Sequence, residues 1–142
     1  MRLWHQKLIP FLDRQRLLGQ HRECCALRGK GWGKKHATVD YVFTHEPARL
    51  VAYHWLVMSE MRRRGYCPDP RWETTNWRGD TLGLDTSFAD PDNVSAFYEE
   101  AHNEEMIYPE HNDEYLAECI SLLKDKNAPI DWGAWQSANY IF

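Results

Sequence analysis

Residues 47 to 65 read PARLVAYHWLVMSEMRRRG, and they predict a long amphipathic helix. Pro47 suits the first turn of a helix, where a missing amide proton costs nothing, and Gly65 suits the position just after the last turn. Between these two residues a mainly apolar stripe recurs at spacings of three and four, formed by Leu50, His54, Val57, Met58 and Met61. We therefore expect a helix over residues 47–64 that buries this stripe in the core.

A second helix is expected before this one. Asp13 is a favourable N-cap after Pro10, and Gly29 and Gly31 end the helix after about Ala26. The apolar side of this helix is expected to hold Leu17, Leu18, His21, Cys24 and Cys25. The opposite stripe is polar, contains a glycine, and consists of Gln15, Gly19, Arg22, Glu23 and Ala26.

The second half of the chain predicts two more helices, over residues 95–105 and 113–124. The second of these has ideal core spacing, at Leu116, Cys119, Ile120 and Leu123. Residues 67–93 carry three prolines and two glycines, which indicates a long packed loop. The chain ends in an aromatic tail that contains Trp132, Trp135, Tyr140 and Phe142. The expected fold class is therefore all-α: a single domain over residues 1–142, with about four helices, long loops and this tail.

Composition limits the class of protein. The chain is 43% hydrophobic and 13% aromatic, which excludes a disordered protein, and its apolar runs are too short to span a membrane. Residues 1–20 are interrupted by charges and hold no apolar segment of the kind found in secretory signals, so we expect a cytoplasmic monomer. The four cysteines form no CxxC pair and are expected to be free thiols.

Charge is distributed unevenly along the chain. The net charge is -4, yet residues 1–66 hold 13 Lys and Arg against 5 Asp and Glu, whereas residues 67–142 hold 4 against 16. A basic first half favours a surface that binds a polyanion, because phosphate contacts require local and not total positive charge. The alternative is that the two halves pair with each other in the fold.

Three local motifs are candidate binding sites, and none of them identifies a ligand by itself. The glycine-rich run from Gly29 to Lys35 lacks the spacing of a phosphate-binding P-loop, so it is either a mobile basic loop with one stacking aromatic, Trp32, or a linker. The run Arg62-Arg63-Arg64 either complements the helix dipole or contacts phosphate. His21, Cys24 and Cys25 resemble the start of a zinc site, but no second compact ligand pair follows, so we predict neither a metal nor a cofactor.

Residues 8–23, which contain Gln15, Leu17, Leu18 and the pair Arg22-Glu23, resemble the first helix of the phage and algal-virus pyrimidine-dimer DNA glycosylases with AP-lyase activity. Three further stretches extend the resemblance: His36-Ala37-Thr38, residues 50–66, and residues 108–132. Within this superfamily the chain is most similar to a bacterial branch whose members begin Met-Arg-Leu-Trp. Ala26 departs from the virus enzymes, which have an arginine there.

The resemblance implies a mechanism. In the virus enzymes the N-terminal amine attacks deoxyribose C1′, forms a Schiff base and permits strand cleavage by β-elimination, while a glutamate handles protons. The resemblance places that glutamate at Glu23 and the amine at Met1, because Arg2 is too large for removal of the initiator methionine. Arg22 is expected to keep Glu23 ionised and to hold a phosphate.

The expected partner is double-stranded damaged DNA, and no membrane. The candidate DNA contacts are Arg2, Gln15, Arg22, Lys34, Lys35, His36 and Trp135. For His36 a purely structural role is the alternative, and for the aromatic tail the alternative is docking on the core. The alternative function for the whole chain is a non-catalytic module that binds nucleic acid or protein and has retained the fold.

Overall fold

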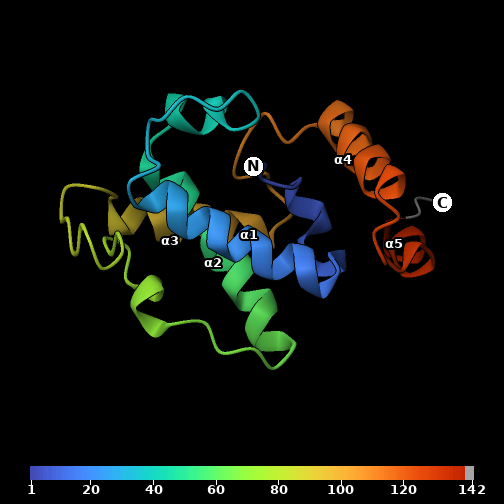
Figure 1. The fold of residues 1–142 in the computed structure, drawn as a ribbon, viewed down its shortest axis with the longest axis horizontal. Coiled ribbons are helices and arrows are strands. Elements are labelled where there is room, and N and C mark those ends of the chain that lie inside the picture. Colours follow the sequence, from blue (N-terminus) through green and yellow to red (C-terminus); the bar gives the residue numbers. More distant parts are fainter. Residues whose placement is uncertain (140–142) are drawn as a thin grey trace.

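The computed structural model describes residues 1–139, which are mostly helical and contain no β-strand (Figure 1). Five α-helices lie in this range: α1 (Arg14–Arg28), α2 (Pro47–Arg63), α3 (Pro91–His102), α4 (Asp113–Asp125) and α5 (Trp132–Asn139). Three short 3₁₀ helices accompany them: η1 (Gln6–Phe11), η2 (Asp40–Thr44) and η3 (Pro70–Glu73). The predicted all-α class is confirmed. Two aromatic residues of the expected tail, Tyr140 and Phe142, lie outside the described residues.

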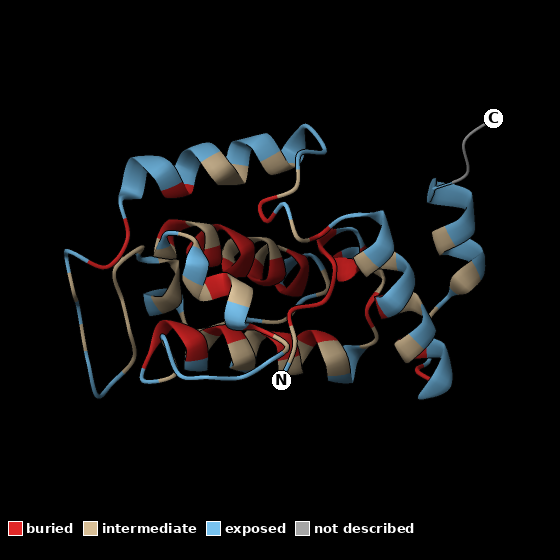
Figure 2. Cartoon of the chain, turned by 90° about the horizontal axis from the view of Figure 1, so that it is seen from above, coloured by how far each residue is buried: buried red, intermediate tan, exposed pale blue. Residues whose placement is uncertain are grey.

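Helix α2 is the central helix of the fold and packs against α1, α3 and η1. It begins at Pro47 as expected, and the chain reverses at Gly65, whose φ of 89° is favourable for glycine. The consecutive residues from Leu50 to His54 are all buried, so α2 is covered on more than one side (Figure 2). Because several elements pack against α2, its apolar residues are not confined to one stripe along the helix.

Helix α1 differs in detail from its prediction. It extends two residues past Ala26, to Arg28. Its buried residues are Leu17, Gln20, Cys24, Leu27 and Arg28, whereas Leu18, His21 and Cys25 are only half-buried. The buried face of α1 is therefore rotated about the helix axis relative to the expected one, because two polar residues, Gln20 and Arg28, lie on the face that packs on α2.

The C-terminal elements also depart from the sequence-based boundaries. Helix α3 starts at Pro91 and not at Ser95, because the Asp90 carboxylate accepts hydrogen bonds from the amides of Asp92 and Asn93 and caps the helix there. Helix α4 lies over the predicted residues, and the first part of the aromatic tail forms α5. Figure 1 shows α4 and α5 together at one end of the molecule.

The predicted loop between α2 and α3 contains only η3 and one isolated bridge, between Trp77 and Leu84. Arg28 anchors it to α1. The Arg28 guanidinium is fully buried and donates hydrogen bonds to three main-chain oxygens, those of Trp72 (2.7 Å), Thr74 (2.7 Å) and Trp77 (3.1 Å). No helix in residues 1–139 is long and apolar enough to cross a membrane.

Candidate active site

The main chain of the N-terminal segment is held against α1. The amide of Arg2 donates to Glu23 Oε2 at 3.3 Å. Gln20, one turn earlier on α1, donates from Nε2 to the Arg2 carbonyl at 2.9 Å and accepts at Oε1 from the Trp4 amide at 2.7 Å. These contacts place the first residues of the chain directly over the helix that carries Glu23.

Three hydroxyl groups from other elements hold the same segment on its other sides. Thr38 donates to the Met1 carbonyl, Tyr115 of α4 donates to the Leu3 carbonyl, and Tyr53 of α2 donates to the Trp4 carbonyl at 2.5 Å. Met1 itself stays 45% exposed. The chain terminus is therefore anchored in position and remains accessible from solvent.

Glu23 lies half-buried beneath this terminus, and its electrostatic setting differs from the expected one. Burial raises the pKa of Glu23 above its usual value. The hydrogen bond from the Arg2 amide, the positive charge of the N-terminus, the hydrogen bond from Gln20 and the charge of His36 all act in the opposite direction. Arg22 is not among the groups that act most strongly on the carboxylate, and the raised pKa of Glu23 is opposite in direction to the expected effect of Arg22.

His36 approaches the terminus through Thr38. Its Nδ1 lies 2.9 Å from the Thr38 hydroxyl oxygen, and its amide donates to Asp40 at 2.8 Å. Because the single Thr38 hydroxyl proton goes to the Met1 carbonyl, Nδ1 of a neutral His36 must be the donor to that hydroxyl. The other ring nitrogen then carries a free lone pair on an exposed side chain.

The arginines expected to contact DNA have different surroundings. The Arg2 guanidinium lies over the Tyr115 ring, 5.6 Å from its centroid, and 3.5 Å from Glu118 of α4. Part of the acidic second half therefore does pair with the basic first half at this point. Arg22 is exposed, and its guanidinium reaches back over Gly19, where a Cβ atom would lie 3.8 Å from it.

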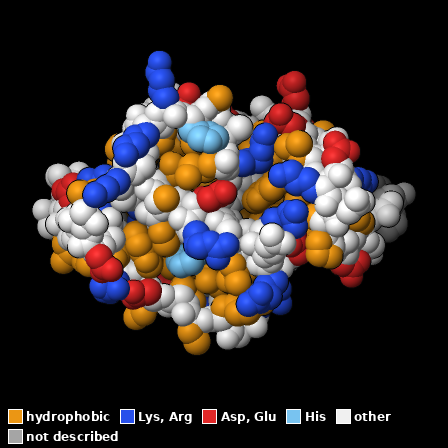
Figure 3. Space-filling view, viewed as in Figure 1, with side chains coloured by type: hydrophobic (Ala, Val, Ile, Leu, Met, Phe, Trp, Pro, Cys, Tyr) orange, Lys and Arg blue, Asp and Glu red, His pale blue; other side chains and the backbone are white. Residues whose placement is uncertain are grey.

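The other polar candidates are exposed. Gln15 lies on α1, about two turns before Glu23, and Lys34 and Lys35 lie in the glycine-rich loop. Figure 3 shows several Lys and Arg side chains on this face of the molecule, with histidine and acidic groups among them. Trp32 is not a free stacking aromatic, because it packs edge-on against Phe43 and Phe88.

Trp135 does not lie with the other candidates. It packs edge-on against Phe11, with ring centroids 5.2 Å apart, and lines an open groove of about 950 Å³ between α5, α4, η1 and α2. None of Met1, Arg22, Glu23 or His36 lines this groove. The position of Trp135 agrees with the alternative that the tail docks on the core.

The three consecutive arginines at the end of α2 are engaged by carboxylates. Arg62 pairs with Glu73, and both Arg63 and Arg64 pair with the buried Glu60. Arg64 also donates to the Pro10 carbonyl. Two carboxylates therefore offset two of the three positive charges, which favours the helix-end interpretation of this run over phosphate contacts.

One cluster has the composition of a metal site. His21, Cys25 and His54 bring their ligand atoms within 4.8 Å of one another. The histidine nitrogens are 2.8 Å apart, and Cys25 Sγ lies 3.8–3.9 Å from them. Ligand atoms around tetrahedral zinc are about 3.3–3.6 Å apart, so the sulfur distances are close to those required and the nitrogen distance is that of a hydrogen bond.

The positions of the protons indicate that Arg28, His54 and His21 form a chain of hydrogen bonds. Arg28 donates to His54 Nδ1 at 3.0 Å, and burial lowers the pKa of Arg28 only to about 10, so it stays charged at neutral pH. His54 Nε2 must then carry the ring proton and donate to His21 Nδ1. Both atoms that face each other are thus occupied, and neither offers a lone pair to a cation.

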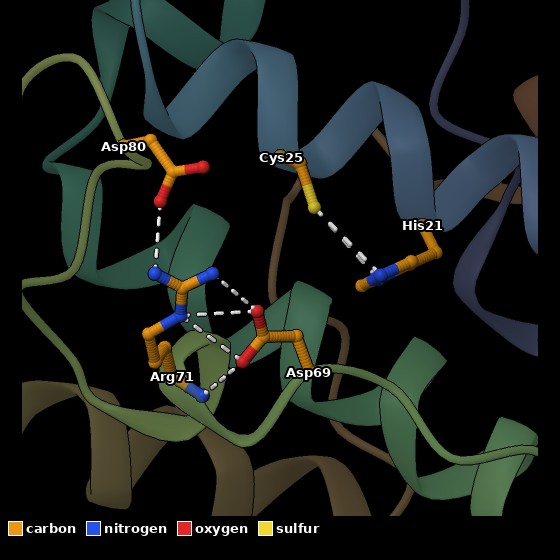
Figure 4. Close-up of polar contacts among 5 residues, drawn as sticks. All are labelled: His21, Cys25, Asp69, Arg71 and Asp80. Carbon is orange, nitrogen blue, oxygen red and sulfur yellow. Dashed lines mark hydrogen bonds and ion pairs between the residues drawn. The ribbon is translucent and has the colours of Figure 1, made fainter.

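The outer side of the cluster faces the loop after α2. Figure 4 shows Asp69 near His21 and Cys25, with its carboxylate bound by Arg71, which also contacts Asp80. Burial raises the pKa of the Cys25 thiol to about 12. This thiol is therefore protonated at neutral pH and unsuited to act as a nucleophile.

Sequence reasoning missed four residues that build the site: Gln20, Thr38, Tyr53 and Tyr115. A signal existed for Gln20, which lies between Leu17 and Cys24 at the spacing of a buried helix face. Thr38 and Tyr115 contact the terminus across 37 and 112 positions of the sequence. No local pattern predicts such contacts.

Comparison with known proteins gave one match. The family model described as pyrimidine dimer DNA glycosylase matches residues 1–74, just over half of the chain. These residues include α1, η2, α2, η3 and the whole anchored N-terminal segment. No curated protein and no solved structure matches the chain.

Proposed function

Because the chain belongs to the pyrimidine dimer DNA glycosylase family, we propose that it is a DNA-repair glycosylase with AP-lyase activity whose nucleophile is the Met1 amine. The observation that carries the proposal is the anchored N-terminus. The main chain of residues 1, 2 and 4 is fixed by hydrogen bonds, and the Arg2 amide donates directly to Glu23. Few other functions call for an exposed terminus held over a half-buried carboxylate.

An α-amine is a suitable nucleophile at neutral pH. Its usual pKa of about 7.7–8.0 leaves roughly one molecule in six unprotonated at pH 7, whereas a lysine near 10.4 is unprotonated about once in a few thousand. Attack of the neutral amine on deoxyribose C1′ forms a C–N bond, and the bond from C1′ to the base breaks. The base leaves with the electron pair and takes up a proton.

Glu23 is the group that moves protons in the later steps. The bound nitrogen gives one proton to the Glu23 carboxylate. Glu23, now a carboxylic acid, donates a proton to the sugar ring oxygen, so that the bond from C1′ to that oxygen breaks and a protonated imine forms between C1′ and the nitrogen. As a carboxylate it accepts a proton from C2′, and the 3′ phosphate leaves by β-elimination. The raised pKa of Glu23 suits it to both roles, because an acid that must also be a base works best near the operating pH.

The substrate of the proposed enzyme is double-stranded DNA with a pyrimidine dimer, an abasic site or another damaged base. Exposing C1′ requires the duplex to bend and a nucleotide to leave the stack, which costs least at damaged positions. The exposed Arg22, Lys34, Lys35 and Gln15 are suited to phosphate contacts around the anchored terminus. The exposed lone pair of His36 is a further candidate for a DNA contact.

The test is reductive trapping. The protein is incubated with a duplex that carries one abasic site or one dimer, in the presence of borohydride, and the covalent complex is counted on a denaturing gel. Intact mass must show that Met1 is the first residue of the protein used. We expect a complex of one chain and one strand, and its loss in Glu23→Gln and in a variant extended by a few residues before Met1.

Lys126→Gln serves as the control variant, because it removes an exposed charge just after the C-terminal end of α4 and is not one of the residues of the proposed site. It should trap as the parent protein does. Absence of any trapped complex on both lesions, with Met1 confirmed as the first residue, contradicts the proposal. Salt-sensitive DNA binding without trapping, unaffected by the N-terminal extension, would then indicate the non-catalytic binding module.

A further inference from the structure

Gln20 is nearly inaccessible to solvent, with 1% of its surface exposed, and lies on the face of α1 that packs against α2. A glutamine in such a position must satisfy both ends of its amide, since an unpaired buried polar group is costly. The partners of Gln20 are two backbone groups of the N-terminal segment, the Glu23 carboxylate and the Tyr53 hydroxyl.

The chemistry of these partners fixes the orientation of the amide. The Trp4 amide can only donate, so the Gln20 oxygen must face it at 2.7 Å. The Arg2 carbonyl can only accept, so the Gln20 nitrogen must face it at 2.9 Å. The second proton of that nitrogen points to Glu23 Oε2, 3.0 Å away. The Tyr53 hydroxyl lies 2.5 Å from the Trp4 carbonyl and 3.0 Å from the Gln20 oxygen, and its single proton goes to the nearer acceptor, so the orientation rests on the Trp4 amide and the Arg2 carbonyl.

One amide nitrogen therefore binds both the main chain of Arg2, the residue next to the proposed nucleophile, and the Glu23 carboxylate. Glu23 Oε2 accepts from both Gln20 and the Arg2 amide, so Arg2, Gln20 and Glu23 form a closed ring of hydrogen bonds. In this ring neither the main chain of Arg2, which carries the terminus, nor the carboxylate can shift without breaking a bond to Gln20. Such fixed geometry matters because displacement of a reacting group by about 1 Å can cost about 100-fold in rate.

We propose that Gln20 is the positioning residue of the active site. It sets the distance between the N-terminal amine and Glu23, and it directs Glu23 Oε2 toward the N-terminal segment. This inference rests on the proposed function for its catalytic consequence. The geometry that it describes exists whether or not the protein acts on DNA. Gln20 acts through Glu23 and the main chain of residues 2 and 4, and it does not touch the substrate.

Two substitutions separate this role from simple support of the fold. Gln20→Glu keeps the shape of the side chain but places an oxygen opposite the Arg2 carbonyl and the Glu23 carboxylate, so that two acceptors meet. Gln20→Met keeps the length and removes every hydrogen bond. In both variants Glu23 loses a donor that favours its ionised form, and the pKa of Glu23 should rise.

The matched control is Gln6→Met. Gln6 is the other buried glutamine of the described chain, 7% exposed, and it also bonds main chain, donating to the Glu105 carbonyl and accepting from the Ile107 amide. It has no contact with Glu23. Its replacement should lower the melting temperature about as much as Gln20→Met does, without changing the chemistry at the site.

Each variant is measured in two ways. The first is the single-turnover rate of trapping on abasic duplex between pH 5 and 9. The second is a carbon-13 NMR titration of the Glu23 carboxyl in the free protein, assigned with Glu23→Gln. We expect both Gln20 variants to react at least about tenfold more slowly, with the pH profile and the Glu23 titration displaced to higher pH. Gln6→Met should leave rate, profile and titration unchanged.

The two readouts distinguish failure of this inference from failure of the proposed function. If the parent protein traps no DNA, the proposed function is wrong, and the titration alone decides whether Gln20 governs Glu23. A Glu23 titration that is unaltered in folded Gln20→Met overturns the inference. So does a loss of rate in Gln6→Met as large as that in the Gln20 variants, because the effect would then be one of stability.

Discussion

At the scale of single residues, the surroundings of Glu23 suit proton transfer but make its ionised form costly for the stability of the fold. Burial disfavours its ionised form, while the donors around it only partly compensate. Oε2 accepts both hydrogen bonds that reach the side chain, those from Arg2 and Gln20. A neutral amide oxygen can accept the same two bonds, so Glu23→Gln should preserve the local geometry without the cost of a half-buried charge.

We therefore predict that Glu23→Gln is at least as stable as the parent protein at neutral pH, although it loses trapping by about 10² to 10⁴-fold. Because the pKa of Glu23 is raised in the folded state, its stabilising contribution is complete in acid and is lost as pH rises through that value. The difference in melting temperature should therefore grow in favour of the variant from pH 4 to pH 8. A variant that melts below the parent protein at pH 8 contradicts this prediction.

Arg22 carries a second prediction at this scale. It is exposed and has no carboxylate partner among the ion pairs of the described residues, whereas Arg63 is paired with Glu60. Arg22→Gln should weaken binding to abasic DNA and reduce the slope of log affinity against log salt by about 1. Arg63→Gln, which removes the same charge, should leave that slope nearly unchanged. Equal effects of the two variants would show that Arg22 has no special place at the DNA.

At the scale of elements, the helix boundaries show what sequence can and cannot predict. The bounds of helix α2 were predicted to within about one residue, because Pro47 and Gly65 mark its ends. Its apolar residues also recur at the spacings of three and four that are typical of a helix. The buried face of α1 was predicted with the wrong rotation, because Gln20 and Arg28 are polar and yet buried. Their partners lie in residues 2–4, 54 and 72–77, and no local pattern points to contacts at such separations.

The end of α1 gives a prediction at the scale of that element. A Cβ atom added at Gly31 would lie 2.7 Å from the Ala26 carbonyl oxygen, which is closer than real contacts allow. At Gly19, within α1, a Cβ atom would meet only the end of the Arg22 side chain. Gly31→Ala should therefore lower the free energy of unfolding by about 1–3 kcal/mol, and Gly19→Ala should raise it by about 0.5–1 kcal/mol.

Urea unfolding at neutral pH measures both free energies. The Gly31→Ala variant should also displace the basic loop, which begins where the Gly31 amide bonds the Ala26 carbonyl. A Gly31→Ala variant as stable as the parent would mean that the chain can open at this turn without loss. In that case the close approach does not constrain the turn.

At the scale of the whole molecule, three buried histidines join elements that are far apart in the sequence. His111 accepts from the Gln6 amide at 3.0 Å and lies 2.7 Å from the Tyr41 hydroxyl, and His5 bonds the His111 carbonyl at 2.8 Å. His54 joins α2 to α1. Burial lowers the pKa of all three, that of His111 to about 3.

This arrangement predicts loss of stability in mild acid. A histidine with a lowered folded-state pKa stabilises the fold above its ordinary value of 6.5, and this contribution is lost as pH falls below it. The free energy of unfolding should fall between pH 6.5 and 4.5, with a limiting slope of about 1.4 kcal/mol per pH unit for each histidine that must take up a proton. Urea unfolding at each pH measures the slope.

His111→Gln is the informative variant, because an amide side chain can still accept from one neighbour and donate to the other. It should be less stable than the parent protein at pH 7 and should lose less stability on acidification. An acid limb of unchanged slope would mean that other groups, such as the acidic residues of α3 and α4, govern the response to pH.

The bonds of the buried Arg28 to the loop after α2 have a consequence for which residues of this chain can be replaced during evolution. Its guanidinium grips carbonyl oxygens at positions 72, 74 and 77, and every amino acid supplies such an oxygen. The side chains at positions 74 and 77 can therefore change without loss of these bonds, whereas the Trp72 ring also contacts the guanidinium, with its centroid 5.1 Å from the guanidinium carbon. The arginine itself has no substitute, since lysine offers a single point charge where three oxygens and a histidine must be met. A segment of irregular backbone can in this way keep its shape while part of its sequence changes, because the residue that holds it lies in a helix 44 to 49 positions earlier in the chain.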